Sequence, residues 1–225
     1  HKNISLMYLI LGTWSGMMGF SISLLMRMEL IKLNQFINNN NLFNMLISIH
    51  ALIMIFFMTM PIIISSFSNW LIPLMIGSND LIFPRTNNMN FWLLNPSLML
   101  MMISMTFNNS INSGWTLYPP LSSMNMTSIN YIIFSLHMNS LSSMLSSLNF
   151  MCSIMNMNSN KMKLNNLTLY IWSILITSIL LTLSLPILTS AITMIIMDSN
   201  INSSFFNPMN NGNPILYQHM FWFFG

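Results

Sequence analysis

The sequence predicts an all-α fold, namely a polytopic membrane helix bundle. Of its 225 residues, 54% are hydrophobic and only 4% are charged. Soluble domains carry about 25% charged residues, so this chain lacks the polar surface that a water-facing fold needs. Its apolar stretches alternate with short polar segments, and about 20 apolar residues in a helix are enough to cross a bilayer.

These stretches are expected to form five full spans and the start of a sixth. Together they would make a single membrane domain that is incomplete at both ends. The expected spans are residues 4–26, 42–76, 84–106, 128–157, 169–197 and, in part, 214–225.

The first two spans have the clearest limits. The first carries no charge until Arg27 and contains Gly12, Gly16 and Gly19. Small residues in such helices mark the close approach of another helix or a cofactor. The second span is apolar almost throughout and contains Pro61, which a spanning helix tolerates where neighbours satisfy the freed carbonyl.

The later spans follow polar turns. The third begins within the polar segment SNDLIFPRTNN and precedes a loop rich in Asn, Gly, Pro and Ser. The fourth is the most polar and carries His137 among many Ser residues. The fifth ends at Asp198, and the run PILYQHMFWFFG looks like the opening of a further span.

His50 is the residue of the second span that most needs an explanation. An imidazole in an apolar span is costly unless another group binds it. It fits a structural role at a helix interface, a role as ligand of haem iron or another metal, or a role in a proton relay. No second His lies three or four residues further on, so any metal site would take its other ligands from another helix.

Arg27 and Glu29 end the first span. They fit an interfacial anchor with a compensating acid, or an Arg fork that holds a polar group of a buried ligand. Trp115 and Tyr118 are expected at the same membrane interface, either as part of its aromatic belt or beside that ligand.

Asp80 is one of only three acidic residues. It fits an ordinary loop residue facing water, or the entrance of a water-filled proton path. Polar side chains in or next to the spans would line such a path. The candidates are Asn69, Asn87, Ser142, Ser143 and Asn149.

Several motifs run in order along the whole chain: ISIHALIMIFFMTMP, DLIFPRTNNMNFWLL, SGWTLYPPLS, SLPILTSAITM and NPILYQHMFWFFG. Together they resemble the subunit I family of mitochondrial cytochrome c oxidase, a haem–copper oxidase. The chain resembles an N-terminal fragment, less than half of a typical member.

The resemblance implies a twelve-helix subunit that reduces O2 to water with electrons from cytochrome c and pumps protons. It implies that His50 is one axial ligand of the low-spin haem a iron. The positions that match the surroundings of this haem are Arg27, Gly16, Ser23, Met54 and Trp115. The second haem a ligand, and the ligands of haem a3 and copper B, would belong to later helices. No catalytic site is therefore expected to be complete in this chain, which alone should be inactive.

The resemblance also implies a proton route, the D pathway, with its entrance at Asp80. The residues that match its lining are Tyr8, Asn69, Asn87, Ser142, Ser143 and Asn149. Trp222 matches an aromatic residue close to the oxygen-reduction centre, and Glu29 matches a carboxylate of an outer cation site. His137 and His219 match no metal ligand.

The implied location is the mitochondrial inner membrane, as a multi-pass protein of the respiratory chain. The implied partners are the other oxidase subunits, especially subunit II, the lipid membrane, and cytochrome c as electron donor through the complex. The net charge of +3 is too small and scattered for a nucleic-acid partner. A quinol oxidase of the same superfamily, a haem-binding membrane electron carrier and a transporter stay open as alternatives.

Overall fold

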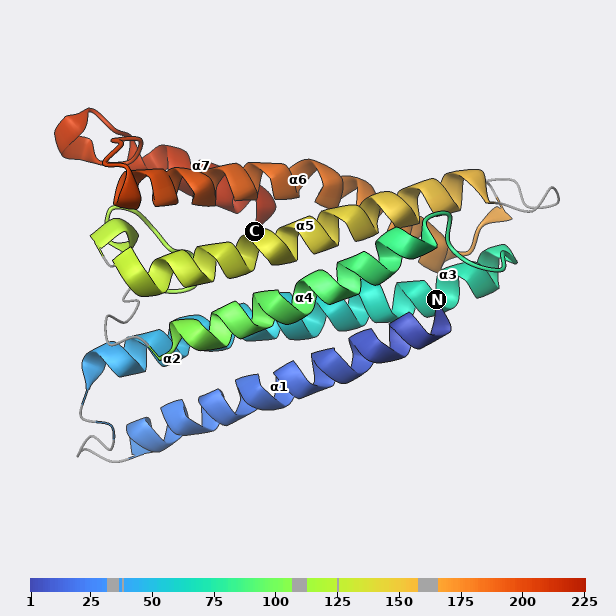
Figure 1. The fold of residues 1–225 in the computed structure, drawn as a ribbon, viewed down its shortest axis with the longest axis horizontal. Helices are drawn as coiled ribbons and strands as arrows, with labels where there is room; N and C mark the ends of the chain where they lie inside the picture. Colours follow the sequence, from blue (N-terminus) through green and yellow to red (C-terminus); the bar gives the residue numbers. More distant parts are fainter. Residues whose placement is uncertain (32–36, 38, 107–112, 125, 158–165) are drawn as a thin grey trace.

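The computed structural model describes all residues except 32–36, 38, 107–112, 125 and 158–165, and every regular element in the described part is a helix. The long helices lie side by side along one direction, and the loops gather at the two ends (Figure 1). The predicted all-α class is therefore confirmed.

The described helices follow one another along the chain in a fixed order. They are α1 (Lys2–Ile31), α2 (Asn40–Leu52), η1 (Ile53–Ser66), α3 (Phe67–Ile76), α4 (Pro84–Ser104), η2 (Ser122–Met124), α5 (Met126–Asn156), α6 (Leu169–Asn200), η4 (Pro208–Asn210) and α7 (Pro214–Phe224). Helices α2, η1 and α3 are continuous and form one rod of 37 residues. At its start the Asn39 side chain accepts hydrogen bonds from two backbone amides, and at its end Gly77 adopts the left-handed conformation, with a φ of 77°.

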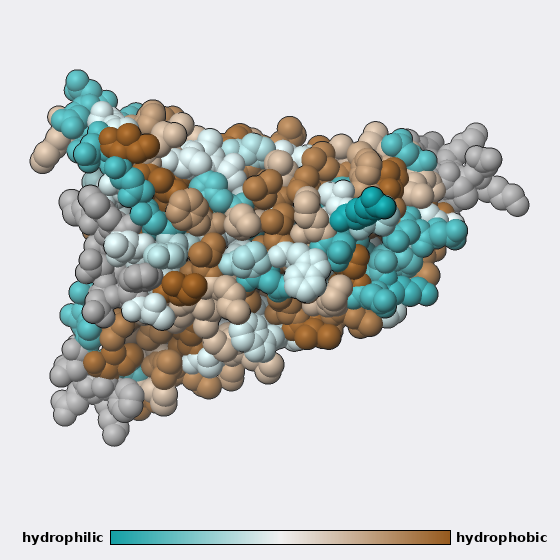
Figure 2. Space-filling view, viewed as in Figure 1, coloured by the Kyte–Doolittle hydropathy of each residue, from teal (hydrophilic) through white to brown (hydrophobic). Residues whose placement is uncertain are grey.

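Three of the described helices are long and apolar enough to cross a membrane: α1, the α2–α3 rod and α6. Helices α4 and α5 have 21 and 31 residues and lie within the same bundle, but their many Asn and Ser side chains make them less apolar. Hydrophobic side chains cover much of the flank of the bundle, and hydrophilic ones gather toward its ends (Figure 2). The number of spans stays a prediction.

The segment η1 winds more widely than an α-helix. The amide of Phe67 donates to the carbonyl of Ile62, five residues earlier, which is the spacing of a π-helix. Pro61 lies within the segment and has no amide hydrogen to donate. Turns of this kind occur frequently at functional sites, and this one begins three residues after His50.

Helix α1 packs closely on η1 through small side chains. Ser15 Oγ donates to the Phe57 carbonyl at 2.7 Å, and Ser66 Oγ donates to the Ser5 carbonyl at 2.8 Å. These bonds from hydroxyl to backbone require the two helix backbones to approach, and small residues at the interface allow that approach.

Helices α4 and α5 are joined by a polar seam. Ser97 Oγ donates to the Ser135 carbonyl and Ser135 Oγ donates to the Ser97 carbonyl, both at 2.6 Å. In Figure 1 the α2–α3 rod lies behind α4, and α7 lies behind α6. Single hydrogen bonds link these helices to the rod, from Asn87 of α4 to Asn69 and from Asn139 of α5 to the Phe56 carbonyl.

A substitution at Gly12 would test how closely α1 approaches η1. A Cβ atom at Gly12 would overlap Ile62 Cγ1, and Ile is stiff at this position. We expect Gly12→Ala in the full-length protein to lower the free energy of unfolding by about 1–3 kcal/mol, measured as the midpoint of thermal unfolding in detergent.

Thr13→Ala, at the exposed neighbouring position, is the control and should leave the midpoint near the wild-type value. Adding Ile62→Ala should make Gly12→Ala cost less than it does in the wild-type background. An equal cost in both backgrounds would contradict the proposed overlap.

Candidate functional site

His50 is held in one orientation by the backbone of α1. Its Nδ1 lies 2.8 Å from the Gly19 carbonyl oxygen, and the ring is partly buried. A carbonyl only accepts hydrogen bonds, so Nδ1 carries a proton, and the neutral form of such a ring has its lone pair on Nε2. Nε2 makes no hydrogen bond within the described residues. This is the arrangement by which a backbone carbonyl orients a metal-binding His.

Two more of the expected haem neighbours lie where α1 packs on η1. A Cβ at Gly19 would lie 2.5 Å from Met54 Sδ, and a Cβ at Gly16 would lie 3.2 Å from Met58 Cγ. The structure therefore places Gly16 and Met54 at the α1–η1 interface, and Met54 contacts Gly19, whose carbonyl holds His50.

Ser23 and Arg27 continue the same side of α1 toward its end, because residues four apart share a helix face. Ser23 Oγ donates to the Phe20 carbonyl at 2.7 Å, and the Arg27 side chain is exposed. Glu29 Oε2 accepts from the Ile37 amide at 2.6 Å, which ties the carboxylate to the chain that follows α1.

Trp115 lies in a different group. Its ring centroid is 5.4 Å from that of Phe221 and 6.2 Å from that of Trp222, both on α7. Trp222 Nε1 donates to Tyr118 Oη at 2.6 Å. The structure thus joins the residue expected near haem a to the residue expected near the oxygen site in one aromatic cluster.

A second set of polar side chains is buried between α1, the rod, α4 and α5. Asn87 Nδ2 donates to Asn69 Oδ1 at 2.8 Å, and Asn69 Nδ2 donates to the Ser65 carbonyl at 2.6 Å. Ser142 Oγ donates to the Asn90 carbonyl at 2.7 Å. Three of the expected proton-route residues therefore lie in helices that pack together.

Tyr8 lies among these side chains. The whole residue is buried, and its hydroxyl lies beside Ser142 and Ser146 without a hydrogen bond of ordinary geometry in the described part of the structure. A buried hydroxyl without a partner is costly, so this oxygen is available to a water molecule or to a passing proton.

A small cavity adjoins the same set. It has a volume of about 10 Å³ and is lined in part by Ser65, Asn139, Ser142, Ser143 and Ser146. That volume is about the room that one water molecule needs, and the lining offers several polar partners for it.

Asp80 and Asn149 lie at the end of this polar set near the N-terminus. The Asp80 side chain is 42% exposed, and its Oδ1 lies 3.5 Å from His1 Nδ1. Asn149 makes two bonds of 3.1 Å with the backbone of Phe83, donating to its carbonyl and accepting from its amide. Asn149 therefore anchors the segment that joins Asp80 to α4.

Sequence reasoning missed several members of the buried polar set. Asn90 lies 3.0 Å from Ser146, Asn139 Nδ2 donates to the Phe56 carbonyl at 3.3 Å, and Ser65 accepts from Asn69. Helical spacing was the available signal, since Asn90 lies three residues after Asn87 and Ser146 four residues after Ser142.

No group of three or more His, Cys, Asp or Glu side chains converges within the described residues. His50 therefore shares no cluster of metal ligands with other residues of that part of the chain.

Comparison with known proteins identifies the class. The helices define a multi-pass membrane protein with an oriented His in a span. A sequence model of the family described as cytochrome c and quinol oxidase polypeptide I matches residues 3–225. The chain belongs to this family.

The relatives agree with this assignment. The chain is 44% identical to cytochrome c oxidase subunit 1 of Eremothecium gossypii and 44% identical to that of Mytilus edulis, over its whole length and over 43% and 42% of theirs. It is 42% identical to cytochrome c oxidase subunit 1 of Pecten maximus, over the whole chain and 48% of the relative. The chain thus spans less than half the length of each of these relatives.

Asn149 tests the anchoring of the Asp80 segment. Asn149→Ala in the full-length protein would leave the Phe83 amide without its acceptor, and an unmade buried hydrogen bond costs about 1–3 kcal/mol. We expect hydrogen–deuterium exchange over residues 80–86 to become faster by roughly tenfold or more.

Asn95→Ala is the matched control, since Asn95 is a partly exposed Asn on α4. It should leave exchange in this segment unchanged. Equal exchange in the Asn149→Ala variant and the wild type would show that Asn149 does not hold the segment.

Proposed function

We propose that the full-length protein is the catalytic subunit of cytochrome c oxidase. It would reduce O2 to water with electrons from cytochrome c and couple this reaction to proton pumping. The family membership and the printed names of the relatives support this proposal. The observation that carries it is the His50 ring, whose Nδ1 is bound to the Gly19 carbonyl and whose Nε2 is left to bind a metal.

The residues around His50 fit one side of a haem a site. His50 Nε2 would hold the iron, and haem a, when bound, would supply one-electron transfer. Arg27 would bond a polar group at the haem edge. Gly16, Ser23 and Met54 would lie around the macrocycle.

Other ligands are proposed to lie outside residues 1–225. These are the second haem a ligand and the ligands of haem a3 and copper B. Trp115 and Trp222 would lie close to the haem groups at the aromatic cluster of α7, and Glu29 would contribute to an outer cation site.

The buried polar set would carry protons toward the oxygen site. Asp80, partly exposed, would take up protons at the surface. Asn69 and Asn87 would line the next part of the proton route, since both side-chain amides are buried and bonded to each other. Tyr8, with its free hydroxyl, would then bridge to the Ser side chains of α5.

On α5, Ser142 and Ser143 would pass the proton on by way of a water molecule in the adjoining cavity. Asn149 would act from a distance, because its bonds to Phe83 fix the segment that carries Asp80.

The assembly and location follow from the same proposal. The protein would lie in the mitochondrial inner membrane as one multi-pass domain, bound to subunit II and other oxidase subunits. Cytochrome c would deliver electrons through that complex. A quinol oxidase is the second candidate, since the family description covers both types, but the relatives described above are named as cytochrome c oxidases.

His50 tests the haem site. In the full-length oxidase, His50→Ala should abolish low-spin haem a, because no other described side chain takes the place of its Nε2. The measurement is the reduced-minus-oxidised absorption band of haem a in the purified complex.

The control is His219→Ala, since His219 is exposed and makes no hydrogen bond within the described residues. It should leave the band intact. An unchanged band in the His50→Ala enzyme would reject the ligand assignment.

Asp80 tests the proton route. Asp80→Asn in the full-length oxidase should slow proton uptake by about a hundredfold, the lower end of what a positioned proton-transferring group contributes. The haem a band should stay, because Asp80 lies in the turn between α3 and α4 and His50 lies in α2. The measurement is proton uptake by enzyme in vesicles, beside the haem spectrum.

Asp80→Glu keeps a carboxylate and should retain most of the uptake. Wild-type pumping by the Asp80→Asn enzyme would count against the role of Asp80 and leave the haem assignment untouched.

A further inference from the structure

The small cavity beside the proposed proton route is lined by four helices, namely η1, α4, α5 and α6. Its volume is about 10 Å³. Two of its lining residues, Ser142 and Ser143, are among those that the family resemblance assigns to the route. Two more polar lining residues have no such assignment, and they come from different helices: Ser65 from η1 and Asn139 from α5.

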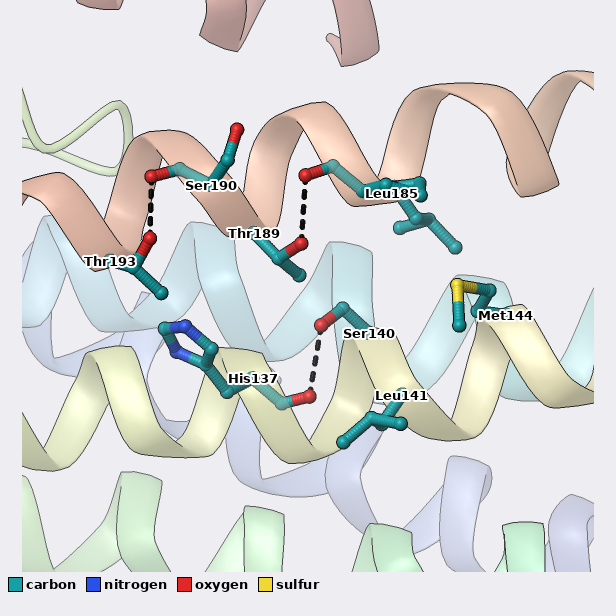
Figure 3. Close-up of a pocket in the computed structure, with 9 residues that line it drawn as sticks. His137, Ser140, Leu141, Met144, Leu185, Thr189, Ser190 and Thr193 are labelled. Atoms are coloured by element: carbon teal, nitrogen blue, oxygen red, sulfur yellow. Dashed lines mark hydrogen bonds between the residues drawn. The ribbon is translucent and has the colours of Figure 1, made fainter.

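Hydroxyl groups in these helices are commonly satisfied by a carbonyl of their own helix. In the groove between α5 and α6, Ser140, Thr189 and Thr193 each donate to the carbonyl three residues earlier, at 2.7–2.9 Å (Figure 3). A hydroxyl that makes this bond has used its only proton. It therefore needs no further acceptor.

The three Ser side chains that α5 contributes to the cavity are satisfied in a similar way. Ser143 Oγ donates to the Ser140 carbonyl at 3.0 Å, and Ser146 Oγ donates to the Ser142 carbonyl at 2.9 Å. Ser142 Oγ donates across to the Asn90 carbonyl of α4 at 2.7 Å. Since these protons are engaged, the three oxygens offer only lone pairs to the cavity.

Ser65 departs from this pattern. Its backbone carbonyl accepts from Asn69 Nδ2 at 2.6 Å, but its hydroxyl makes no hydrogen bond within the described residues. The residue is only 8% exposed. A buried hydroxyl without a partner is costly, so Ser65 brings an unused donor to the cavity.

Asn139 brings an unused acceptor. Its Nδ2 donates to the Phe56 carbonyl of η1 at 3.3 Å. A carbonyl accepts only, so this bond fixes which end of the amide is the nitrogen. The Oδ1 atom at the other end accepts no hydrogen bond within the described residues, and the residue is only 5% exposed.

Both unpaired oxygens border open space. Neither belongs to the fully enclosed unpaired atoms of the described part of the chain, and the cavity is a space that both residues line. One water molecule fits this volume, and a buried water makes about three hydrogen bonds to groups that otherwise lack a partner. Water both donates and accepts, so a single molecule satisfies the two residues together.

We propose that Asn139 and Ser65 bind one ordered water molecule in this cavity and act as positioning residues for proton transfer past Ser142 and Ser143. The water donates to Asn139 Oδ1 and to a Ser oxygen of α5, and it accepts from Ser65 Oγ. One lone pair then stays free. A proton taken up there is balanced by the release of another proton of the same water further along the route.

The two parts of this proposal have different foundations. The water site depends only on the contacts of Asn139, Ser65 and the Ser residues of α5. The positioning role rests on the proton route proposed above. The two parts are therefore tested by separate measurements.

Structure determination of the full-length oxidase tests the water site. At a resolution that shows ordered waters, we expect one density peak within about 3.0 Å of both Asn139 Oδ1 and Ser65 Oγ. The peak should weaken in the Ser65→Ala enzyme and vanish in the Asn139→Leu enzyme. An empty cavity in the wild type, or a side chain of a later helix in the place of the peak, would overturn the proposal.

Ser65→Ala tests the positioning role, because it removes no hydrogen bond between described side chains. We expect this variant of the full-length oxidase to take up protons about fivefold more slowly, the effect of losing one ordinary hydrogen bond to the water. The haem a band should be unchanged. The measurement is proton uptake by enzyme in vesicles.

Ser147→Ala is the matched control. Ser147 is buried on α5 and donates to the Met144 carbonyl at 2.7 Å, but it does not line the cavity. Its replacement should leave both the water peak and proton uptake at the wild-type level.

Asn139→Leu keeps the number and branching of the side-chain heavy atoms and replaces both polar ones. It should slow proton uptake at least as much as Ser65→Ala does. Because it also removes the bond to the Phe56 carbonyl, the haem a band is its control for folding. If the band is lost, the Ser65→Ala enzyme decides.

Wild-type uptake by the Ser65→Ala enzyme would overturn the positioning role even where the water peak is present. Wild-type uptake by the Asp80→Asn enzyme would instead count against the proton route itself. The density peak would then still decide whether Asn139 and Ser65 bind a water molecule.

Discussion

The structure depends above all on the close approach of α1 to the rod formed by α2, η1 and α3. The absence of a side chain at Gly19 lets Met54 pack against the α1 backbone, and the carbonyl of the same residue accepts from His50 Nδ1. A Cβ atom at Gly19 would overlap Met54 Sδ, so the Met54 side chain would have to move. The orientation of the one His in the second span thus follows from the packing of small residues on the first.

The polar groups of the interior are also constrained by their surroundings. A hydroxyl or amide in a membrane span must find a partner within the protein. Most of the described Ser and Asn side chains do so by donating to a helix carbonyl, as Ser97 and Ser135 do across the seam of α4 and α5. The buried hydroxyl of Tyr8 has no such partner in the described residues, and the same is true of Ser113 and Ser122 before α5. Ser142 and Ser146, which lie beside this hydroxyl, line a cavity of about the size of one water molecule.

The sequence pattern identified several candidate site residues but did not show which of them contact one another. His50, Asn69 and Asn87 were selected because polar side chains in apolar spans need a partner, and the two Asn residues do bond each other. The residues missed by the sequence analysis, such as Asn90 and Ser146, are ordinary in composition. They gain importance only because α4 and α5 face each other. Their roles, like those of the selected residues, stay proposals.

The sequence by itself determined the helical class and the family, since low charge and long apolar runs exclude a water-facing fold and the motifs identify the oxidase subunit. It did not determine which polar groups meet. The partner of His50 is a carbonyl 31 residues earlier in the chain, and a backbone atom leaves no trace in a residue pattern. The grouping of Trp115 with α7, rather than with His50, was likewise decided by how the helices pack. Only the tertiary structure fixes such contacts, because they depend on the distance and rotation between helices, which spacing along one chain does not specify.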